Sequence, residues 1–440
     1  MTTIYYGYIM DTPDSPFTGG NLRAETAALA VTGGRIVFRG GLTDAEAAFP
    51  EAEVVRFDGL LIPGMVDTHV HYPQLPVVGG LGMPLLQWLD ECALPQEVRL
   101  ADNDHARDLA GRFLGGLARA GTTSALVFGS HYATAMHTFF DAAASSGLRI
   151  TSGVVVSDRN LREELHTTPK IAREKMAGLI DAWHGKGNLR YAVTPRFSLS
   201  ASEAMLEACA EAFASAPGVY FTSHVNESRE EVKVVAELFP HLTSYTDTYD
   251  AFGLLTDHSV LAHNVHPTSA ELARLAQTGS SIAHCPTSNS SLGSGLFPLS
   301  AHIDAGVRVA LGSDVGAGTG LCLVKEGLQA YFQQQLHEDG YPLTPAHLLY
   351  LATRAGALAL DLAHVGHLSE GMAFDAVHFS PAEGSTFSYV LGGAPDPSAA
   401  LASLFTLATE ADIAAVYVDG VAVSHRDESS GKVLSAPALS

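Results

Sequence analysis

The middle of the chain alternates between short apolar runs rich in β-branched residues and longer segments in which Ala, Leu and Glu recur. Runs of the first kind predict buried parallel strands, and segments of the second kind predict the helices that connect them. Eight such runs are present, at 65–71, 122–128, 149–156, 189–197, 220–225, 259–264, 280–286 and 307–314. The helical segments fall between them, at 101–120, 134–146, 171–184, 201–215, 229–238 and 268–277.

Two architectures share this alternation, a (β/α)8 barrel and a doubly wound open sheet. Eight β/α units over roughly 270 residues fit the barrel in number and in length. Six of the runs also end in residues capable of chemistry, and barrel enzymes carry their sites at the carboxyl ends of the strands. These residues are His69 and His71, Arg196, His224, His263, His284 and Asp314. The pattern therefore favours a (β/α)8 TIM-like barrel.

Both ends of the chain have a different pattern, in which short strand-like runs alternate with turns. At the start these runs are 2–10, 26–40 and 52–62, and towards the end they are 375–380 and 414–423. Two β-rich ends around one α/β middle predict a small β-sandwich domain built from both termini. We therefore expect residues 1–62 and 369–440 in the β-sandwich and residues 63–368 in the barrel.

The charge balance limits the classes of partner. The chain has 25 basic and 47 acidic residues among 440, a formal net charge of −22. So acidic a surface repels nucleic acid and anionic membranes, and we expect neither as a partner. A small-molecule substrate is the expectation that remains.

The cysteines and the apolar stretches bear on the compartment. The four cysteines are widely spaced, which argues against a disulfide framework and a structural zinc site: Cys92, Cys209, Cys285 and Cys322. The first residues lack the basic and apolar regions of a signal peptide, and the uncharged stretches are too rich in Ser, Thr, Asn, Gly and Pro to cross a bilayer. We therefore expect a cytoplasmic protein.

His69 and His71 end the first run and lie two residues apart. On a strand these two side chains share a face, so both imidazoles point towards the barrel axis. Two neutral imidazoles side by side suit a divalent metal. An isolated His-x-His pair is more often one structural and one exposed histidine, so the metal hypothesis depends on ligands downstream.

Such ligands follow at the ends of later runs. Asp314 ends the eighth run before two glycines, either as a metal-binding carboxylate or as part of a turn. His224 ends the fifth run, and Glu227 follows it, where it could move protons or begin a helix. His263 ends the sixth run and could be a fourth nitrogen ligand, or lie beside the metal and polarise the bond under attack. Three histidines and one aspartate leave room for a water at the metal, as catalytic zinc or iron requires.

Arg196 ends the fourth run, at a place where barrel hydrolases with two bridged metals often have a lysine. The absence of a lysine favours a single metal. Arg196 is also the only Lys or Arg between Tyr191 and Ser228. One guanidinium at a strand end of so acidic a protein is suited to bind a substrate oxygen, and the alternative is a salt bridge with a neighbouring loop.

Several segments together resemble the amidohydrolase superfamily of metal-dependent hydrolases. They are 63–74, 84–97, 194–203, 223–232, 261–267, 281–295 and 312–318, and 365–377 resembles the return of that family into its β-sandwich. The His-x-His pair and the string HCPTSN mark only the superfamily. The string HYPQ taken together with PRFSLS resembles its guanine deaminases.

The resemblance implies one metal ion per chain, zinc or alternatively iron, held by His69, His71, His224 and Asp314. It implies that Glu227 shuttles a proton, that Asp314 helps to deprotonate the attacking water and that His263 supports the departing group. It also implies a homodimer.

The resemblance further implies that guanine lies against Gln74, Arg196 and Phe197, with Leu86 and Trp88 as walls of the pocket. Arg196 can only donate hydrogen bonds, so it suits the carbonyl of guanine and not the amine of adenine. Gln74 has a donor and an acceptor and could read a purine edge with both. His131, His266 and His284 are ambiguous, and His284 could line the pocket.

Two other readings compete with this one. The same mechanism could act on another aminated heterocycle, such as a pterin, a triazine or a modified purine. Alternatively, the barrel could have lost catalysis and serve in assembly or binding, but such relatives typically lose metal ligands, and every expected ligand is present here.

Overall fold

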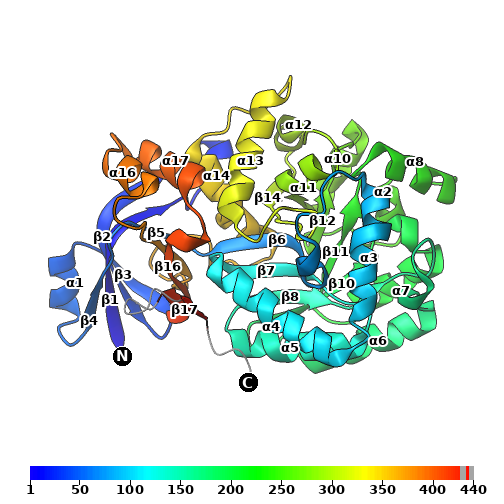
Figure 1. The fold of residues 1–440 in the computed structure, drawn as a ribbon, viewed down its shortest axis with the longest axis horizontal. Helices are drawn as coiled ribbons and strands as arrows, with labels where there is room; N and C mark the ends of the chain where they lie inside the picture. Colours follow the sequence, from blue (N-terminus) through cyan, green and yellow to red (C-terminus); the bar gives the residue numbers. More distant parts are fainter. Residues whose placement is uncertain (427–432, 436–440) are drawn as a thin grey trace.

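All eight apolar runs form strands of one parallel sheet in the computed structural model, which describes residues 1–426 and 433–435. The strands are β6 (Met65–His71), β7 (Thr122–Phe128), β8 (Arg149–Gly153), β9 (Val155–Val156), β10 (Leu189–Pro195), β11 (Tyr220–Val225), β12 (Ser259–His263), β13 (Ser281–His284) and β14 (Arg308–Leu311). Their order is β14-β13-β12-β11-β10-β8-β7-β6, with β9 beside β10. Helices surround the sheet, so nearly every strand residue is buried. The predicted barrel is confirmed (Figure 1).

Backbone bonds between the first strand and the segment after the last one close the barrel. The His71 N–H donates to the Val315 carbonyl at 2.9 Å, and the Asp314 N–H donates to the His69 carbonyl at 2.9 Å. The Thr68 hydroxyl adds a bond to the Leu311 carbonyl at 2.8 Å. Because closure runs through His69, His71 and Asp314 themselves, these three residues are fixed relative to one another.

The six predicted helices are present within a few residues of their expected bounds. They are α4 (Asn103–Arg119), α5 (Ala133–Ser146), α6 (Pro169–Trp183), α7 (Glu203–Phe213), α8 (Arg229–Leu238) and α10 (Ser269–Thr278). Side-chain caps explain several starts: Ser228 and Thr268 each form a capping box with the glutamate three residues later. Shorter elements complete the barrel side, among them η2 (Tyr72–Val77), α2 (Leu85–Trp88), η3 (Leu89–Ala93), α3 (Leu94–Arg99), α9 (Asp247–Asp250), α11 (Pro286–Ser291), α12 (Leu299–Asp304), α13 (Leu323–Leu336), α14 (Pro345–Ala352) and α15 (Arg354–Ala359).

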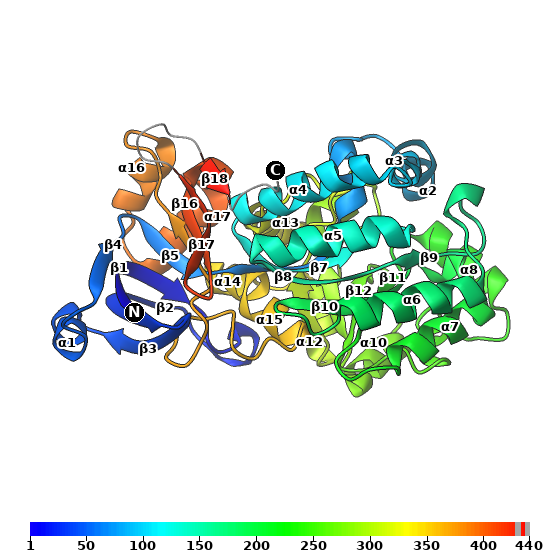
Figure 2. The same ribbon diagram turned by 90° about the horizontal axis from the view of Figure 1, so that it is seen from below.

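Both ends of the chain contribute strands to a second, mostly antiparallel sheet. It contains β1 (Thr2–Asp11), β2 (Arg23–Thr32), β3 (Arg35–Gly40), β4 (Glu53–Arg56), β5 (Leu60–Pro63), β15 (Ala376–Phe379), β16 (Ile413–Val418), β17 (Val421–Arg426) and β18 (Val433–Ser435). The two ends meet where β5 pairs with β15, and Figure 2 shows the blue and the orange-red strands beside each other. The helices α1 (Leu42–Ala48), α16 (Thr386–Gly392) and α17 (Pro397–Leu407) accompany this sheet. The predicted β-domain from both termini is confirmed.

The chain passes from the second sheet into the barrel between Pro63 and Met65. The expected domain bounds, 1–62, 63–368 and 369–440, remain a prediction, and residues 427–432 and 436–440 lie outside the described residues. A buried ion pair links the two parts: Arg149 of β8 donates to both carboxylate oxygens of Asp375, at 2.8 and 3.1 Å.

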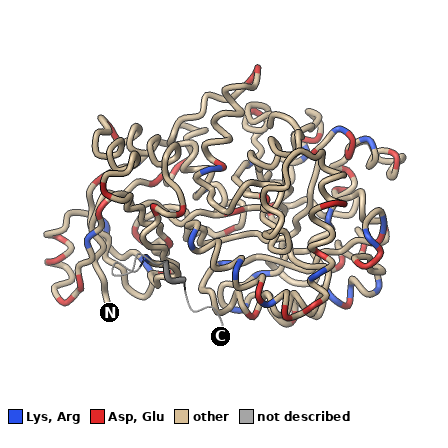
Figure 3. Tube along the Cα trace, in the orientation of Figure 1, with Lys and Arg blue, Asp and Glu red and all other residues tan. Residues whose placement is uncertain are grey.

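The surface carries the charges that the composition implies. Acidic residues are distributed along the chain in both parts of the molecule (Figure 3). Among the described residues, no helix combines the length and the apolar character needed to cross a bilayer.

The buried Glu326 of α13 makes the stability of the fold depend on pH. Its carboxylate is fully buried and accepts hydrogen bonds from the N–H and the hydroxyl of Thr287, at 2.9 and 2.7 Å. Burial raises the pKa of Glu326 to about 8, and the nearby Asp67 adds to this effect. Because the folded pKa lies above the ordinary value of 4.5, folding favours the protonated form. The contribution of Glu326 to stability is therefore present below about pH 4.5 and lost as the pH rises through about 8.

We expect Glu326→Gln, which mimics the protonated form, to gain stability relative to the wild type as the pH rises. From pH 5 to pH 9 this gain in the free energy of unfolding should be at most a few kcal/mol. The corresponding gain in Tm should be at least about 2 °C. Thermal unfolding of both proteins at pH 5, 7 and 9 measures it. A Tm difference that stays constant over this range would show that Glu326 does not titrate there.

Candidate active site

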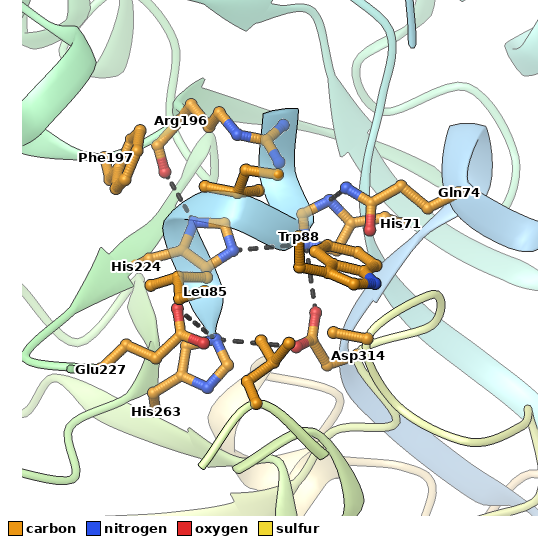
Figure 4. Close-up of a pocket in the computed structure, with 13 residues that line it drawn as sticks. His71, Gln74, Leu85, Trp88, Arg196, Phe197, His224, Glu227, His263 and Asp314 are labelled. Atoms are coloured by element: carbon orange, nitrogen blue, oxygen red, sulfur yellow. Dashed lines mark hydrogen bonds and ion pairs between the residues drawn. The ribbon is translucent and has the colours of Figure 1, made fainter. Parts of the chain in front are cut away.

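The carboxyl ends of the barrel strands surround one cavity (Figure 4). The residues that line it are His71, Gln74, Leu85, Trp88, Leu89, Arg196, Phe197, His224, Glu227, His263, Leu292, Asp314 and Ala317. Most of the residues singled out from the sequence therefore meet in one place, although they come from strands far apart in the chain.

Four of the candidate metal ligands lie in mutual contact. The Nε2 atom of His71 lies 3.1 Å from Nε2 of His69 and 3.3 Å from Nε2 of His224. Oδ1 of Asp314 lies 3.2 Å from Nε2 of His69 and 3.3 Å from Nε2 of His71. Ligand atoms about 2.1 Å from one tetrahedral zinc ion lie about 3.4 Å apart, so these spacings fit one metal ion.

A second grouping replaces His71 with His263. The ligand atoms of His69, His224, His263 and Asp314 all lie within 4.8 Å of one another. This grouping is looser, because Nε2 of His263 lies 3.8 Å from Oδ2 of Asp314. The set with His71 has the shorter spacings and fits one metal ion better.

The protonation states also fit a metal. Nδ1 of His224 donates to the Arg196 carbonyl at 2.6 Å, which leaves the lone pair of its Nε2 facing the other three ligands. Burial lowers the pKa of His69 and of His224, and lowers that of His71 to about 4, so all three imidazoles are neutral near pH 7. Three neutral nitrogens with one carboxylate form a donor set that zinc and iron accept.

Asp67 supports this cluster from behind and was not singled out from the sequence. Its Oδ1 accepts the backbone N–H groups of His69 and Ser313, at 3.1 and 3.0 Å. Its Oδ2 accepts the Ser313 hydroxyl at 2.5 Å. Asp67 therefore joins the first strand to the residue before Asp314 and fixes both sides of the cluster.

Glu227 reaches the cavity from the turn after β11. Asn226 adopts φ = 49°, a left-handed conformation that asparagine tolerates, and this turns the chain so that Glu227 faces inward. Oε2 of Glu227 lies 3.5 Å from Nε2 of His263, while Oε1 is buried without a hydrogen-bond partner in the described part of the chain. Burial, with the charges of Glu231 and Asp314, raises the pKa of Glu227 well above its ordinary value.

The ring of His263 is held by a residue that lies outside the cavity. Its Nδ1 donates to Oδ1 of Asn289 at 3.0 Å, so Nε2 faces Glu227 and Asp314. His263 and Asp314 both have positive φ, 74° and 46°. Such backbone is unfavourable for residues other than glycine and is typical of active sites.

Arg196 faces the cavity, and a carboxylate outside the cavity holds it. Nη1 of Arg196 donates to both oxygens of Glu97, at 2.6 and 2.8 Å. Gln74 also donates to Glu97, at 2.8 Å, and its Oε1 accepts the Gly316 N–H at 3.2 Å. Both ends of the Gln74 amide therefore have protein partners. The sequence left two roles open for Arg196, a substrate contact or a salt bridge. In the structure Arg196 forms a salt bridge and also faces the cavity.

The apolar walls differ in part from the prediction. Phe197 and Trp88 line the cavity, but Leu86 does not. Leu85, Trp88 and Leu89 are three and four residues apart and share the inner face of this short helical segment. Leu86 points instead into a neighbouring groove that Leu89 and Phe197 also border.

The three ambiguous histidines lie outside the cavity. Nε2 of His131 is 3.1 Å from Oε2 of Glu97. His284 is buried, and its ring stacks on Phe297 with ring centres 4.2 Å apart. Nε2 of His266 donates to the Ser294 carbonyl at 2.8 Å. None of the three is among the residues that line the cavity.

Comparison with known proteins places this geometry in a family. The Amidohydrolase family matches residues 60–423. The "Probable guanine deaminase" of Deinococcus radiodurans is 54% identical over 437 residues, which cover 96% of this chain and 99% of that protein. The "Guanine deaminase" of Escherichia coli is 35% identical and covers 92% of each chain. A crystal structure of guanine deaminase from C. acetobutylicum with guanine bound in its active site superimposes with a TM-score of 0.89, at 26% identity, over 96% of this chain and 100% of that one. The chain belongs to the amidohydrolase family, among the relatives of guanine deaminases.

Proposed function

We propose that this protein is a guanine deaminase, which hydrolyses guanine to xanthine and ammonia. The observation that carries the proposal is Arg196, which faces the His/Asp cluster from the opposite wall and is the only Lys or Arg among the described residues that line the cavity. A guanidinium can only donate, so it matches a ring carbonyl beside the amine to be removed. The relatives named guanine deaminases, and the one with guanine bound, support the same substrate.

One zinc ion per chain is the proposed cofactor, with iron as the alternative that the donor set also accepts. His69, His71, His224 and Asp314 would hold it. When bound, a divalent metal supplies the acidity that makes water a nucleophile near pH 7. The three histidines contribute no charge, so Asp314 provides the only anion of the set and partly balances the cation.

Glu227 is the proposed proton carrier. In the overall reaction a C–O bond forms at C2 of guanine and the C2–N bond breaks; one hydrogen of the water ends on a ring nitrogen and the other leaves with ammonia. Oε1 of Glu227, which has no partner in the described residues, can carry the first proton to the ring nitrogen and the second to the departing amine. His263, whose Nδ1 is held by Asn289, can donate from Nε2 to the oxygen that becomes the C2 carbonyl of the product when both of its ring nitrogens carry a hydrogen.

Arg196 and Phe197 are the proposed base-binding residues. Arg196 would donate to the C6 carbonyl, and the Phe197 ring and Trp88 would cover the faces of the purine. Gln74 would contact the purine only through what its bonds to Glu97, Gly316 and His71 leave free, so its contribution to recognition is smaller than the sequence indicates.

Two further properties belong to the proposal. Phe332 and Leu336 are exposed, 45% and 76%, on one face of α13, and we propose that a second copy covers them in a homodimer.

The four cysteines are free, which fits the reducing cytoplasm that we propose as the compartment.

The direct test is ammonia release by the purified protein from guanine, a pterin, an aminotriazine and adenine. We expect guanine to be the best substrate and a strong chelator to remove the activity, which added zinc restores. Ultraviolet absorbance of the product identifies xanthine. If guanine is inert and a ring without the carbonyl is hydrolysed, the assignment is wrong; a folded, metal-free and inert protein would instead support a non-catalytic barrel.

A further inference from the structure

Glu97 is a buried carboxylate that the proposed chemistry does not use. It lies on α3, only 2% exposed, and does not line the cavity. Burying a carboxylate is costly unless several groups donate to it. Donors to Glu97 come from three other parts of the barrel mouth, so their identity indicates its purpose.

Two of these donors are the polar residues of the substrate wall. Arg196, after β10, gives both hydrogens of Nη1 to Glu97, and Gln74, in η2, gives one hydrogen of Nε2. The third donor is His131, whose Nε2 lies 3.1 Å away and whose own carbonyl accepts from Lys175 at 3.2 Å. One carboxylate thus connects two substrate-facing side chains that are 122 residues apart in the sequence.

These bonds determine which atoms of Arg196 remain for a ligand. Within the part of the chain that the structure describes, the ion pair with Glu97 occupies Nη1, and Nη2 and Nε have no acceptor. The planar guanidinium of Arg196 is held at Nη1, so Nη2 and Nε keep a fixed direction. The negative charge of Glu97 also balances the buried guanidinium, which would otherwise be poorly solvated.

We propose that Glu97 is a positioning residue that sets Arg196, and through it the preference of the site for a purine with a carbonyl at C6. The inference rests on the proposed function, because the carbonyl partner is that of guanine. Burial alone would raise the pKa of Glu97, but Arg196, His131 and Gln74 hold it well below its ordinary value, so the carboxylate is charged at all working pH values. A charged acceptor of this kind fixes its donors more firmly than a neutral one.

A purely structural role is the alternative. Glu97 could simply attach α3, and with it the wall of Leu85, Trp88 and Leu89, to the barrel. In that case its loss would loosen the whole wall and weaken every ligand alike. A role through Arg196 weakens only ligands that carry the carbonyl.

The test compares two unreactive ligands, hypoxanthine, which has the C6 carbonyl but no C2 amine, and purine, which has neither. We expect Glu97→Gln to raise the inhibition constant of hypoxanthine by about 10- to 100-fold, the range for one hydrogen bond to a charged group. The inhibition constant of purine should change less than about threefold. The KM for guanine should rise along with the inhibition constant of hypoxanthine. Glu97→Asp, which keeps the charge, should restore part of the lost affinity.

A matched control separates this effect from the loss of any buried ion pair. Asp375→Asn breaks the Arg149–Asp375 pair, which is buried but lies at the junction with the β-domain. We expect it to lower Tm while the ratio of the two inhibition constants stays at its wild-type value. In an Arg196→Ala background, Glu97→Gln should cause no further loss of hypoxanthine affinity, because the two residues act as one unit.

The outcomes are distinguishable. If the wild type does not release ammonia from guanine, the proposed function fails, and the inference with it. If the wild type is active but Glu97→Gln weakens purine as much as hypoxanthine, or adds its full effect in the Arg196→Ala background, the positioning role is wrong and the function stands. Equal affinities of wild type and Glu97→Gln for hypoxanthine would overturn it as well.

Discussion

Glu227→Gln is expected to lower kcat for guanine by about 10³-fold or more, within the range for removal of a general acid–base group. The amide has the size of the carboxylate but can neither take the proton of water nor deliver it to the purine. Because Glu227 is not among the four proposed metal ligands, the metal content should be the same as in the wild type. Binding of hypoxanthine should change little, since Arg196 and Phe197 are untouched.

Steady-state kinetics, metal analysis and inhibition by hypoxanthine measure these three quantities together. Glu231→Gln is the matched control, because Glu231 is also a buried glutamate on the same segment but has its own partners, the Tyr245 hydroxyl and the backbone N–H groups of Glu227 and Ser228. We expect it to lose at most about tenfold, since an amide oxygen can still accept from the backbone. A Glu227→Gln enzyme with more than a tenth of the wild-type kcat would assign the proton transfer to another group.

The sequence predicts the frame of this site because the relevant rules are local. His69 and His71 share a face through the two-residue period of a strand, and the structure places their Nε2 atoms 3.1 Å apart. The polar residues that follow the apolar runs meet because parallel strands of a barrel end at one rim. His284 is the exception: it ends a run, yet it stacks under Phe297 away from the cavity.

The supporting carboxylates could not be predicted in the same way. Asp67 holds Ser313 from 246 residues away, and Glu97 holds Arg196 from 99 residues away. Nothing local distinguishes Glu97 from an exposed helical glutamate, because only its burial and its partners reveal it. Leu86 was expected to line the pocket, and the structure places it elsewhere for a related reason. The register of a four-residue helix, not the composition of the segment, decides which leucine faces inward.

The arrangement around Arg196 changes how its substitution must be interpreted. Arg196→Ala alone removes the carbonyl partner but also leaves the buried Glu97 without its cationic partner, and breaking a buried ion pair typically costs about 3–5 kcal/mol. A loss of activity in that variant would therefore combine recognition with local disruption. The double variant with Glu97→Gln removes the unpaired charge and isolates recognition.

Asp314→Asn is expected to remove most of the metal and at least about 10³-fold of the activity. Asp314 is the only anion among the four proposed ligands, and its Oδ1 lies within 3.3 Å of both His69 and His71. An amide oxygen offers a weaker, uncharged ligand and cannot accept the proton of water. A chelator should lower the Tm of the wild type, because a ligand that binds only the folded state stabilises it. The Tm of the Asp314→Asn variant should hardly change.

Asp361→Asn is the control for the backbone at this position. Asp361 is exposed and has φ = 45°, close to the 46° of Asp314, and asparagine tolerates this left-handed conformation. The same change there should leave metal content, activity and the Tm response to chelator as in the wild type. If Asp314→Asn kept one metal ion per chain and more than a tenth of the activity, the four-residue set would be wrong. His263, whose Nε2 lies within 4.8 Å of the ligand atoms of His69 and His224, would then become the fourth ligand to test.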